Sequence, residues 1–400
     1  MVLGMRNNRV LISGVSVAGP ALAFWLHRHG FTPTVVERAP ELRDGGYAVD
    51  FRGASLRVLD RMGLLEQVEA AATRMGEVTY VDGDDRPLVV TPASFQSGEL
   101  EILRGDLSRI LYDATEDGVE YVFGDSITGV TEHGDGVTVT FEHGEPREFD
   151  LVVGADGLHS NVRSLVFGDE SRFRRDLGYY VSIFTVPNHL GLDRVGRFYN
   201  EPNRTVGVYS ARDNTEAKAL FWFGSGPLEY DHRNIEQQRR IVEQTFRDVG
   251  WETSTLLEAM RGAPDFYFDS ASQIKLDTYS RGRVALVGDA AYCAAPLSGM
   301  GTSLAIVGAY VLAGELAAAG GDHETAFRAY SGEMRGFVEA CQKLAEGNGK
   351  WFVPPTRAWL KFRNLNYRLL PYLPWRKLIE ELPLKAGNAI TPKQYAVAPA

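Results

Sequence analysis

The stretch from Val10 to Ala21 constrains the fold more than any other part of the sequence. A short apolar run ends in Gly14, and a helical pattern begins directly after Gly19. The next apolar run ends in the acidic residue Glu37. This order of strand, glycine turn, helix, strand and acidic residue is typical of a dinucleotide-binding βαβ unit. It predicts an α/β fold with a Rossmann-like domain at the start of the chain.

The residue types in this unit suit a pyrophosphate. Gly14 allows a sharp turn, and Gly19 lets the helix pack closely on the sheet. The free N–H groups at the helix start, together with the helix dipole, attract a phosphate. Ser16 stands where a second glycine is usual, and its hydroxyl can donate to phosphate. An ordinary βαβ turn without a ligand is the alternative that this stretch alone leaves open.

Two later segments repeat the pattern of a buried strand followed by Gly and Asp. One apolar run ends at Gly154 and leads to Asp156, and another ends at Gly288 and leads to Asp289. Taken alone, either aspartate could be a helix cap or a turn former. A glycine-containing loop that starts at Pro296 then leads into a long apolar helix.

Composition excludes several classes of protein. The 400 residues carry a net charge of −10, which argues against nucleic acid as the main partner. The only two cysteines, Cys293 and Cys341, fit a reducing compartment, and we expect a cytoplasmic protein. The N-terminus lacks the pattern of a signal peptide, and the apolar stretch Ser303 to Gly320 contains Glu315. We therefore expect a buried helix there and no stable membrane insertion. The scattered histidines predict no metal site.

Hydrophobic periodicity predicts the other elements. From about residue 176 to 278, alternating apolar and polar residues rich in aromatics predict an antiparallel sheet with two helices beside it. We expect a helix over 55–72, a hairpin over 77–81 and 87–91, and a meander over 127–131, 136–142 and 147–153. The tail from Trp351 to Pro383 is basic and aromatic, and we interpret it as short helices packed across the body, with a membrane-surface role as the alternative.

Together the three motifs resemble a known family. Gly14-x-Ser16-x-x-Gly19, Gly154-Ala155-Asp156-Gly157, and Gly288-Asp289 with Pro296 and Gly299-x-Gly301 occur in this order, and Arg104 lies between the first two. The set resembles the FAD-dependent aromatic hydroxylases of the para-hydroxybenzoate hydroxylase fold. It looks closest to the branch that holds tetracycline-modifying and aromatic-polyketide monooxygenases. The resemblance covers most of the chain.

The resemblance implies a role for each matching residue in binding FAD. The pyrophosphate would lie on Gly14, Val15, Ser16, Ala18 and Gly19. Glu37 would meet the adenosine ribose, and Arg38 would lie along the adenine. Arg104 resembles the arginine that meets the ribityl–phosphate region, and Gly288-Asp289 the pair that meets a ribityl hydroxyl. The pyrimidine side of the flavin would face Pro296, Gly299, Met300, Gly301 and Thr302.

Further positions follow from the same resemblance. Asp156-Gly157 resembles the motif implicated in both FAD and NADPH binding, with Arg163 nearby. Arg43 and Asp50 fall in a loop that passes near the isoalloxazine in relatives. Cys293 lies near the flavin, and we expect a buried, inert thiol there.

The resemblance also implies a domain plan. The FAD-binding domain would comprise residues 1–73, 98–175 and 279–345. The substrate domain, a mostly antiparallel sheet inserted into the first, would comprise residues 74–97 and 176–278. Residues 346–400 would form a C-terminal helical segment. The predicted walls of the substrate pocket are Phe221 and Phe223, from the aromatic run Phe221-Trp222-Phe223, together with Tyr199 and Tyr209 from earlier strands.

The implied activity is that of a monooxygenase with non-covalent FAD. NADPH or NADH would reduce the flavin, O2 would add to form a flavin hydroperoxide, and the distal oxygen would pass to an electron-rich aromatic substrate. Because the chain has one nucleotide fingerprint, NAD(P)H would bind transiently in a groove. No catalytic base can be assigned. The alternatives are a reductase or dehydrogenase of the same fold and a flavin-dependent sensor without redox activity. The oligomeric state would be monomer or homodimer.

Overall fold

The computed structural model describes residues 7–42, 46–92, 98–372 and 376–396, with the side chains of residues 371 and 376–380 left out. Its central sheet has the strand order β17-β18-β11-β1-β2-β7. The five strands from β18 to β7 are parallel, and only β17 runs antiparallel. The strands are β1 (Arg9–Ser13), β2 (Thr32–Glu37), β7 (Glu120–Phe123), β11 (Leu151–Gly154), β17 (Ser280–Arg281) and β18 (Val284–Leu286).

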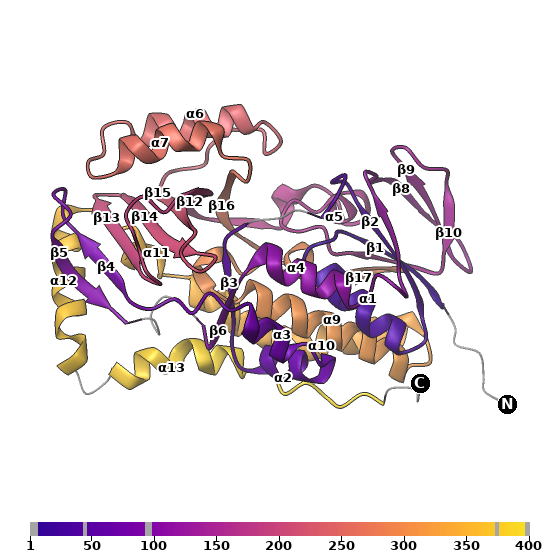
Figure 1. Cartoon of the computed structure of the whole chain (residues 1–400). Helices are drawn as coiled ribbons and strands as arrows, with labels where there is room; N and C mark the ends of the chain where they lie inside the picture. The colour runs from indigo at the N-terminus through magenta and orange to yellow at the C-terminus, as the bar shows by residue number, and fades with distance from the viewer. Residues whose placement is uncertain (1–6, 43–45, 93–97, 373–375, 397–400) are drawn as a thin grey trace.

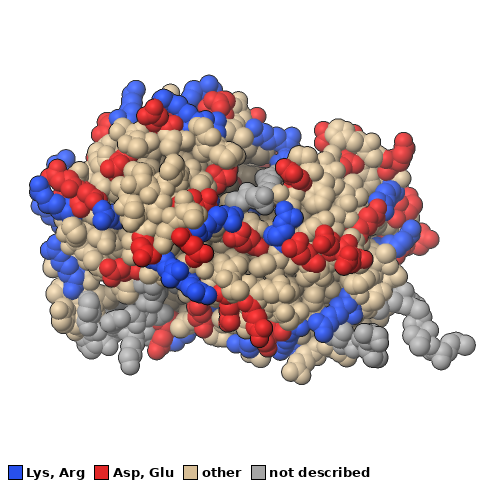
Figure 2. All heavy atoms as spheres, in the orientation of Figure 1, with Lys and Arg blue, Asp and Glu red and all other residues tan. Residues whose placement is uncertain are grey.

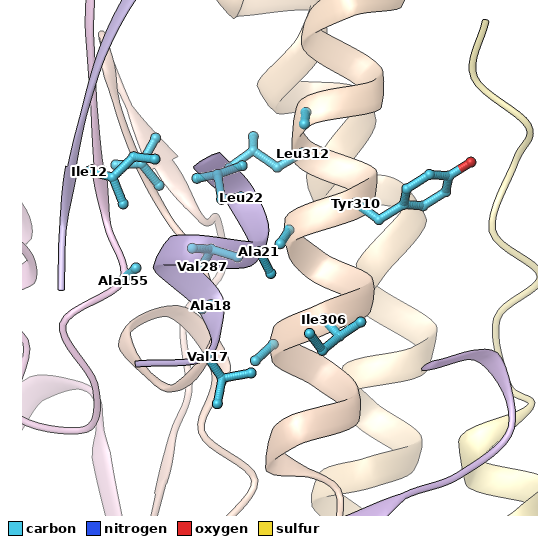
Figure 3. Packing of buried hydrophobic residues seen from close by; sticks show 14 of the residues in the cluster. Ile12, Val17, Ala18, Ala21, Leu22, Ala155, Val287, Ile306, Tyr310 and Leu312 are labelled. Atoms are coloured by element: carbon cyan, nitrogen blue, oxygen red, sulfur yellow. The ribbon is translucent and has the colours of Figure 1, made fainter. Parts of the chain in front are cut away.

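Long helices cover this sheet and form the main core. Helix α1 (Ala18–Arg28) packs against α9 (Gly301–Ala318), which also contacts α10 (His323–Ala345) and α2 (Ala54–Met62). Figure 3 shows Leu22 of α1 facing Leu312 of α9, whereas the Tyr310 side chain of α9 points toward the C-terminal segment, where its hydroxyl donates to the Lys393 carbonyl oxygen. Among the described helices, α9 alone has the length and apolar composition of a membrane span, and 83% of its residues are buried inside the protein. It is therefore the central core helix of this fold.

A second, larger sheet lies beside the first (Figure 1). Its strand order is β16-β12-β15-β14-β13-β4-β5, and every pairing is antiparallel except that of β4 with β13. Helices α6 (Ile235–Phe246) and α7 (Thr253–Gly262) cover one face. The strands are β4 (Val78–Val81), β5 (Pro87–Thr91), β12 (Arg174–Pro187), β13 (Gly196–Glu201), β14 (Arg204–Ala211), β15 (Glu216–Gly224) and β16 (Tyr267–Ile274).

Smaller elements complete the fold. Strands β8 (Ile127–Glu132), β9 (Val137–Phe141) and β10 (Arg147–Phe149) form a meander, and β3 (Ala48–Phe51) pairs with β6 (Leu100–Leu103). The remaining helices include α3 (Leu65–Ala70), α4 (Arg104–Asp113), α5 (Asn161–Phe167) and α8 (Asp289–Tyr292). The C-terminal segment contains α11 (Gly349–Phe352), α12 (Arg357–Leu369), η4 (Leu370–Tyr372) and α13 (Arg376–Gly387).

The predicted α/β architecture with an inserted, mostly antiparallel sheet is confirmed, and two local predictions are wrong. The helix expected over 55–72 is two helices, because Gly63 adopts φ +76° and ends α2 in the left-handed conformation. The strand expected over 147–153 is also divided. Its first part, β10, stays in the meander, whereas β11 joins the parallel sheet beside β1.

We expect Gly19→Ala to destabilise the protein, because its Cβ would stand 2.0 Å from the carbonyl oxygen of Gly14. The expected loss is about 1–3 kcal/mol of unfolding free energy, measured by chemical denaturation. Gly336→Ala in α10 is the matched control, since nothing lies within 4 Å of its added Cβ. The control should gain about 0.5–1 kcal/mol. Equal stability of the two variants would contradict this packing account.

Candidate functional site

The three sequence motifs meet at one edge of the central sheet. In register, Ser13 of β1 lies beside Val36 of β2 and Gly154 of β11, and Gly154 lies beside Leu286 of β18. The loops after these strands therefore leave the sheet at the same edge. A crevice at the carboxyl ends of parallel strands is where α/β folds bind ligands.

Glycine is required where the first two loops touch. Gly14 has φ +111°, and a Cβ on it would stand 2.6 Å from the carbonyl oxygen of Ala155. The Gly14 oxygen in turn lies where a Cβ of Gly19 would be, as described above. These contacts fix the start of α1 against the loop after β11.

Glu37 holds the glycine loop from the side. Its carboxylate accepts hydrogen bonds from the backbone N–H of Val15 at 2.8 Å and of Ala39 at 2.9 Å. The side chain therefore lies at the end of β2 beside the turn, where the sequence places an acidic residue. Arg38 is exposed at the surface next to it.

Arg104, the first residue of α4, faces the same loop. Its Nε and Nη2 donate to the Ser16 hydroxyl oxygen at 3.1 and 2.9 Å, and its guanidinium carbon lies 5.8 Å from the centre of the Tyr47 ring. Among the described residues, no carboxylate lies within ion-pair distance of this half-buried cation. A partly buried positive charge that contacts a serine hydroxyl and a tyrosine ring, with no carboxylate in ion-pair contact among the described residues, fits an anionic ligand.

Two helix N-termini open at this edge. Neither α1, with Val17 before it, nor α9, with Met300 before it, has a side-chain cap or an acidic residue in its first turn. Gly288, at φ +65°, lies between the two starts, and its Cβ would stand 3.0 Å from that of Ala18 and 3.7 Å from that of Ala305. Uncapped N–H groups at the ends of two core helices fit a ligand with negatively charged groups.

Asp289 and Cys293 lie next to the α9 start. The Asp289 Oδ1 atom is 3.8 Å from the place of a Cβ on Gly301. Burial raises the pKa of Asp289, and the positive charge of Arg104 opposes that shift. The Cys293 thiol donates to the carbonyl oxygen of Ser272 at 3.4 Å, and burial raises its pKa well above the ordinary value. This environment keeps the thiol protonated.

The loop before α9 is held in a strained shape. Ala295 adopts φ +69° and ψ 150°, a conformation that side chains disfavour. The Ser298 hydroxyl donates to the Ala295 carbonyl oxygen at 2.8 Å and accepts from the Met300 N–H at 3.1 Å. Arg52 Nη1 donates to the Gly299 carbonyl oxygen at 3.0 Å. These bonds preorganise the loop that carries Pro296 to Thr302.

A carboxylate pair adjoins this loop. Asp50 of β3 lies directly opposite Glu101 of β6, and Arg52 Nη1 lies 3.3 Å from the Asp50 carboxylate. Burial, followed by the nearby Asp50 carboxylate, raises the pKa of Glu101 to about 7. Burial also raises the pKa of Asp50. The pair therefore retains a proton close to neutral pH. Arg43, expected in the same loop, lies outside the described residues.

Asp156 is engaged at the start of α5. Its carboxylate accepts from the Ser160 hydroxyl at 2.5 Å and from the Val162 N–H at 3.0 Å. This is the capping alternative that the sequence left open, and burial raises the pKa of the carboxyl. The fully buried Arg163 donates to the Ala290 carbonyl oxygen at 3.0 Å and pairs with Glu170 at 2.8 Å. It therefore ties α5 to the loop of the third motif.

His159 joins this loop to the second sheet. Its ring nitrogens lie 3.0 Å from a Glu170 oxygen and 3.2 Å from an Asp269 oxygen on β16. Burial alone would lower the pKa of His159, but these hydrogen bonds outweigh it and raise the pKa to about 9. A charged histidine between two carboxylates thus fixes β16 against the loop that follows β11.

The predicted pocket residues lie on two opposite faces of the second sheet. Phe221 and Phe223 of β15 and Tyr199 of β13 pack in the cluster under α6 and α7. Tyr209 points to the opposite face, where its hydroxyl accepts from the Ala48 N–H at 3.4 Å. Because side chains alternate along a strand, Trp222 shares the face of Tyr209.

The face opposite α6 and α7 carries an apolar cluster that the sequence interpretation missed. Tyr47, from the loop after the double glycine, has its ring 5.4 Å from that of Tyr267. Both rings pack at the margin of an apolar cluster that contains Trp222. The alternation within β15 is the signal that separates Trp222 from Phe221, but no local signal singles out Tyr267.

Comparisons with known proteins identify the family. The FAD binding domain family matches residues 7–345. The uncharacterized protein Rv1260 of Mycobacterium tuberculosis is 51% identical over 345 residues, covering 85% of this chain and 93% of that protein. A flavin-dependent monooxygenase of Legionella longbeachae is 41% identical over 343 residues, covering 85% and 88%.

A solved structure agrees with these matches along the whole chain. The tetracycline destructase Tet(51) superposes with a TM-score of 0.86 at 36% identity and covers 98% of this chain and 100% of its own. FAD, the cofactor implied by these relatives, suits the edge described above, because uncapped helix starts and Arg104 are positive partners for an anionic dinucleotide. The chain therefore belongs to the family of FAD-dependent aromatic hydroxylases and is an FAD-dependent monooxygenase.

Proposed function

We propose that this enzyme oxygenates planar, electron-rich polycyclic compounds of the tetracycline or aromatic-polyketide kind. The observation that carries the proposal is the pair of rings Tyr47 and Tyr267 beside Arg104, at the margin of the apolar cluster that contains Trp222. Flat aromatic walls suit flat aromatic ligands. The names of the relatives, above all tetracycline destructase, support the same substrate class.

The residues at the strand ends are proposed to hold FAD. The N–H groups at the start of α1, with Ser16 and Arg104, suit the pyrophosphate, and Glu37 suits the adenosine ribose. Asp289 suits a ribityl hydroxyl, and the N–H groups after Met300 suit the pyrimidine edge of the flavin. Bound FAD supplies hydride acceptance and oxygen activation. Arg38, Asp156 and the loop residues Pro296, Gly299, Gly301 and Thr302 complete the proposed contacts.

The second sheet is proposed to place the substrate against the flavin. We keep Tyr209 as a proposed pocket residue and add Trp222 from the same face, because Tyr199, Phe221 and Phe223 pack under α6 and α7. Tyr209 lies near Asp50 and Glu101, whose negative charges raise the pKa of its hydroxyl further after the effect of burial. The hydroxyl therefore stays protonated and can donate to a substrate oxygen.

The proton retained by Asp50 and Glu101 gives this end of the pocket a group that can exchange protons near neutral pH. Neither carboxylate needs to move for this purpose, because Arg52 and the Gly98 N–H hold Asp50 in place.

Reduction by NAD(P)H is typical of the family, and we propose that the nicotinamide nucleotide binds transiently in a groove. The relatives named as monooxygenases disfavour the alternative of a reductase without oxygen transfer. We also propose a cytoplasmic monomer or homodimer, in keeping with its two buried free thiols.

The direct test is oxygen incorporation. The FAD-loaded enzyme is incubated with NADPH and a tetracycline or an anthraquinone under ¹⁸O2, and the mass of the product is measured by mass spectrometry. The proposal expects one labelled oxygen atom in the product. A product that is reduced without label would establish the reductase alternative. The redox-inactive sensor would instead show no NADPH consumption.

Arg104→Gln should weaken FAD binding about 10–100-fold, because a charge-assisted contact to phosphate is lost. The affinity is measured by flavin fluorescence quenching on the deflavinated protein. Arg240→Gln, an exposed arginine on α6, is the matched control and should leave the affinity unchanged. Undiminished affinity of Arg104→Gln would exclude Arg104 from the cofactor site.

Glu101→Gln should flatten the pH dependence of stability. The folded-state pKa of Glu101, about 7, lies above its ordinary value of 4.5. The stabilisation it gives is therefore complete below pH 4.5 and is lost as pH rises through 7. Between pH 5 and pH 7.5 the unfolding free energy of the wild type should fall by about 1–3 kcal/mol more than that of the variant, measured by urea denaturation. Exposed Glu66→Gln should follow the wild type.

Trp222→Phe and Phe223→Leu form a matched pair on opposite faces of β15. Trp222→Phe shortens the proposed wall and should raise the substrate KM about fivefold or more, roughly 1 kcal/mol, with unchanged flavin content. Phe223→Leu should lower the melting temperature through lost packing and keep the KM within about twofold. The reverse pattern would place the substrate on the α6 and α7 side.

A further inference from the structure

Helix α12 presents an apolar stripe to solvent at the edge of the molecule, beside β5 (Figure 1). The side chains of Phe362, Leu365, Leu369 and Tyr372 are 48%, 54%, 46% and 83% exposed. Their spacing places them along one face of α12 and the turn that follows it. Large apolar side chains gathered in one exposed stripe mark an interaction surface.

The segment that carries the stripe is strongly basic. Residues 350–372 contain five Lys or Arg and no Asp or Glu. Residues 346–400 as a whole carry nine basic and three acidic residues, a net charge of +6, whereas the rest of the chain carries −16. Figure 2 shows Lys and Arg atoms at the end of the molecule where α12 lies. This charge asymmetry singles out the segment from an otherwise acidic protein.

The exposed cations lie along one flank of the stripe. At 100° per residue, Arg357, Lys361 and Arg368 follow one line beside Phe362 and Leu369. All three cations are exposed, and Arg368 also donates from Nε and Nη2 to the Leu88 carbonyl oxygen of β5 at 2.9 and 2.7 Å. An apolar face bordered by Lys and Arg is the pattern of a helix that lies in the interface of an anionic membrane.

Aromatic rings strengthen the pattern at the start of the helix. The rings of Trp359 and Phe362 pack at a tilt of 46°, with centres 5.3 Å apart, and Trp351 adjoins both. The Trp359 indole N–H donates to the Lys350 carbonyl oxygen at 2.8 Å. Amphipathic aromatic rings of this kind favour the level of lipid headgroups.

The helix is mounted firmly on the protein by its other face. Thr356 caps its start by accepting from the Trp359 N–H at 3.1 Å. The buried Arg363 stacks 4.2 Å from the centre of the Tyr80 ring and donates to the Asn200 side-chain oxygen at 2.9 Å. The stripe is therefore a preformed surface that needs no folding on contact.

Charge decides between a membrane and a second copy of the chain. A symmetric dimer through α12 would place Arg357, Lys361 and Arg368 against their own copies, with no acidic residue on α12 to offset the repulsion. An anionic lipid surface complements the same cations.

We infer that α12 docks this enzyme peripherally on an anionic membrane surface, with Phe362, Leu365 and Leu369 in the interface and Arg357, Lys361 and Arg368 against lipid phosphates. The docking is independent of the substrate and leaves the rest of the chain in water. It involves no insertion of the core helix α9, which stays buried.

The test is flotation of the FAD-loaded full chain with vesicles. Vesicles of phosphatidylcholine with 30% phosphatidylglycerol should carry the wild type, whereas vesicles of phosphatidylcholine alone should not. Lys361→Gln should weaken binding about fivefold, and raised salt should weaken it further. The double variant Phe362→Ser, Leu369→Ser should weaken binding at least tenfold. Flavin absorbance checks that each variant is folded.

Matched controls come from α6. Ile235→Ser removes an apolar side chain that is 49% exposed, and Arg240→Gln removes an exposed cation. Both should float like the wild type. Three results would overturn the inference. These are a wild type that ignores anionic vesicles, α12 variants that float unchanged, and a concentration-dependent dimer abolished by Phe362→Ser, Leu369→Ser, which would assign the stripe to a second copy.

Discussion

The close backbone contact between the first two loops is the constraint on which the rest of the site depends. Gly14 lies against Ala155, and Gly19 lies against Gly14, at distances that exclude a Cβ. These contacts bring the start of α1 to the carboxyl edge of the sheet. Gly288 does the same for α9 by fitting between Ala18 and Ala305. Two uncapped helix starts thereby meet at one edge, where an anionic cofactor would supply partners for their N–H groups.

The second sheet packs against the edge that is proposed to bind the cofactor. His159 joins the loop after β11 to Asp269 on β16, so the position of the sheet relative to the cofactor edge rests on a charged hydrogen-bonded bridge. The bridge places Tyr267 against Tyr47, next to Arg104. The same sheet buries its other face under α6 and α7. The opposite face also carries a buried cluster, with Phe352 of α11 packed on Trp222, and Tyr47 and Tyr267 lie at its margin.

Local patterns allowed much of this to be predicted from the sequence. Each motif follows its own strand, so the strand ends, the glycines and the acidic residues could be placed without knowledge of the tertiary fold. The orientation of β15 could not be predicted in this way. Period-two alternation places Phe221 and Phe223 on one face and Trp222 on the other, but it does not say which face lies under α6 and α7. Asp156 likewise has one spacing for two roles, and only the structure shows it bonded to Ser160 and Val162. The pairing of Asp50 with Glu101 depends on the register of distant strands.

The central claim is that the meeting strand ends hold a flavin that NAD(P)H reduces and oxygen reoxidises. The most direct measurement is the visible spectrum of the purified protein before and after NADPH is added in air, with dissolved oxygen recorded in parallel. The account predicts a flavin spectrum that bleaches on addition of NADPH and recovers as oxygen is consumed. A colourless protein that takes up no added FAD would contradict the assignment of all three motifs.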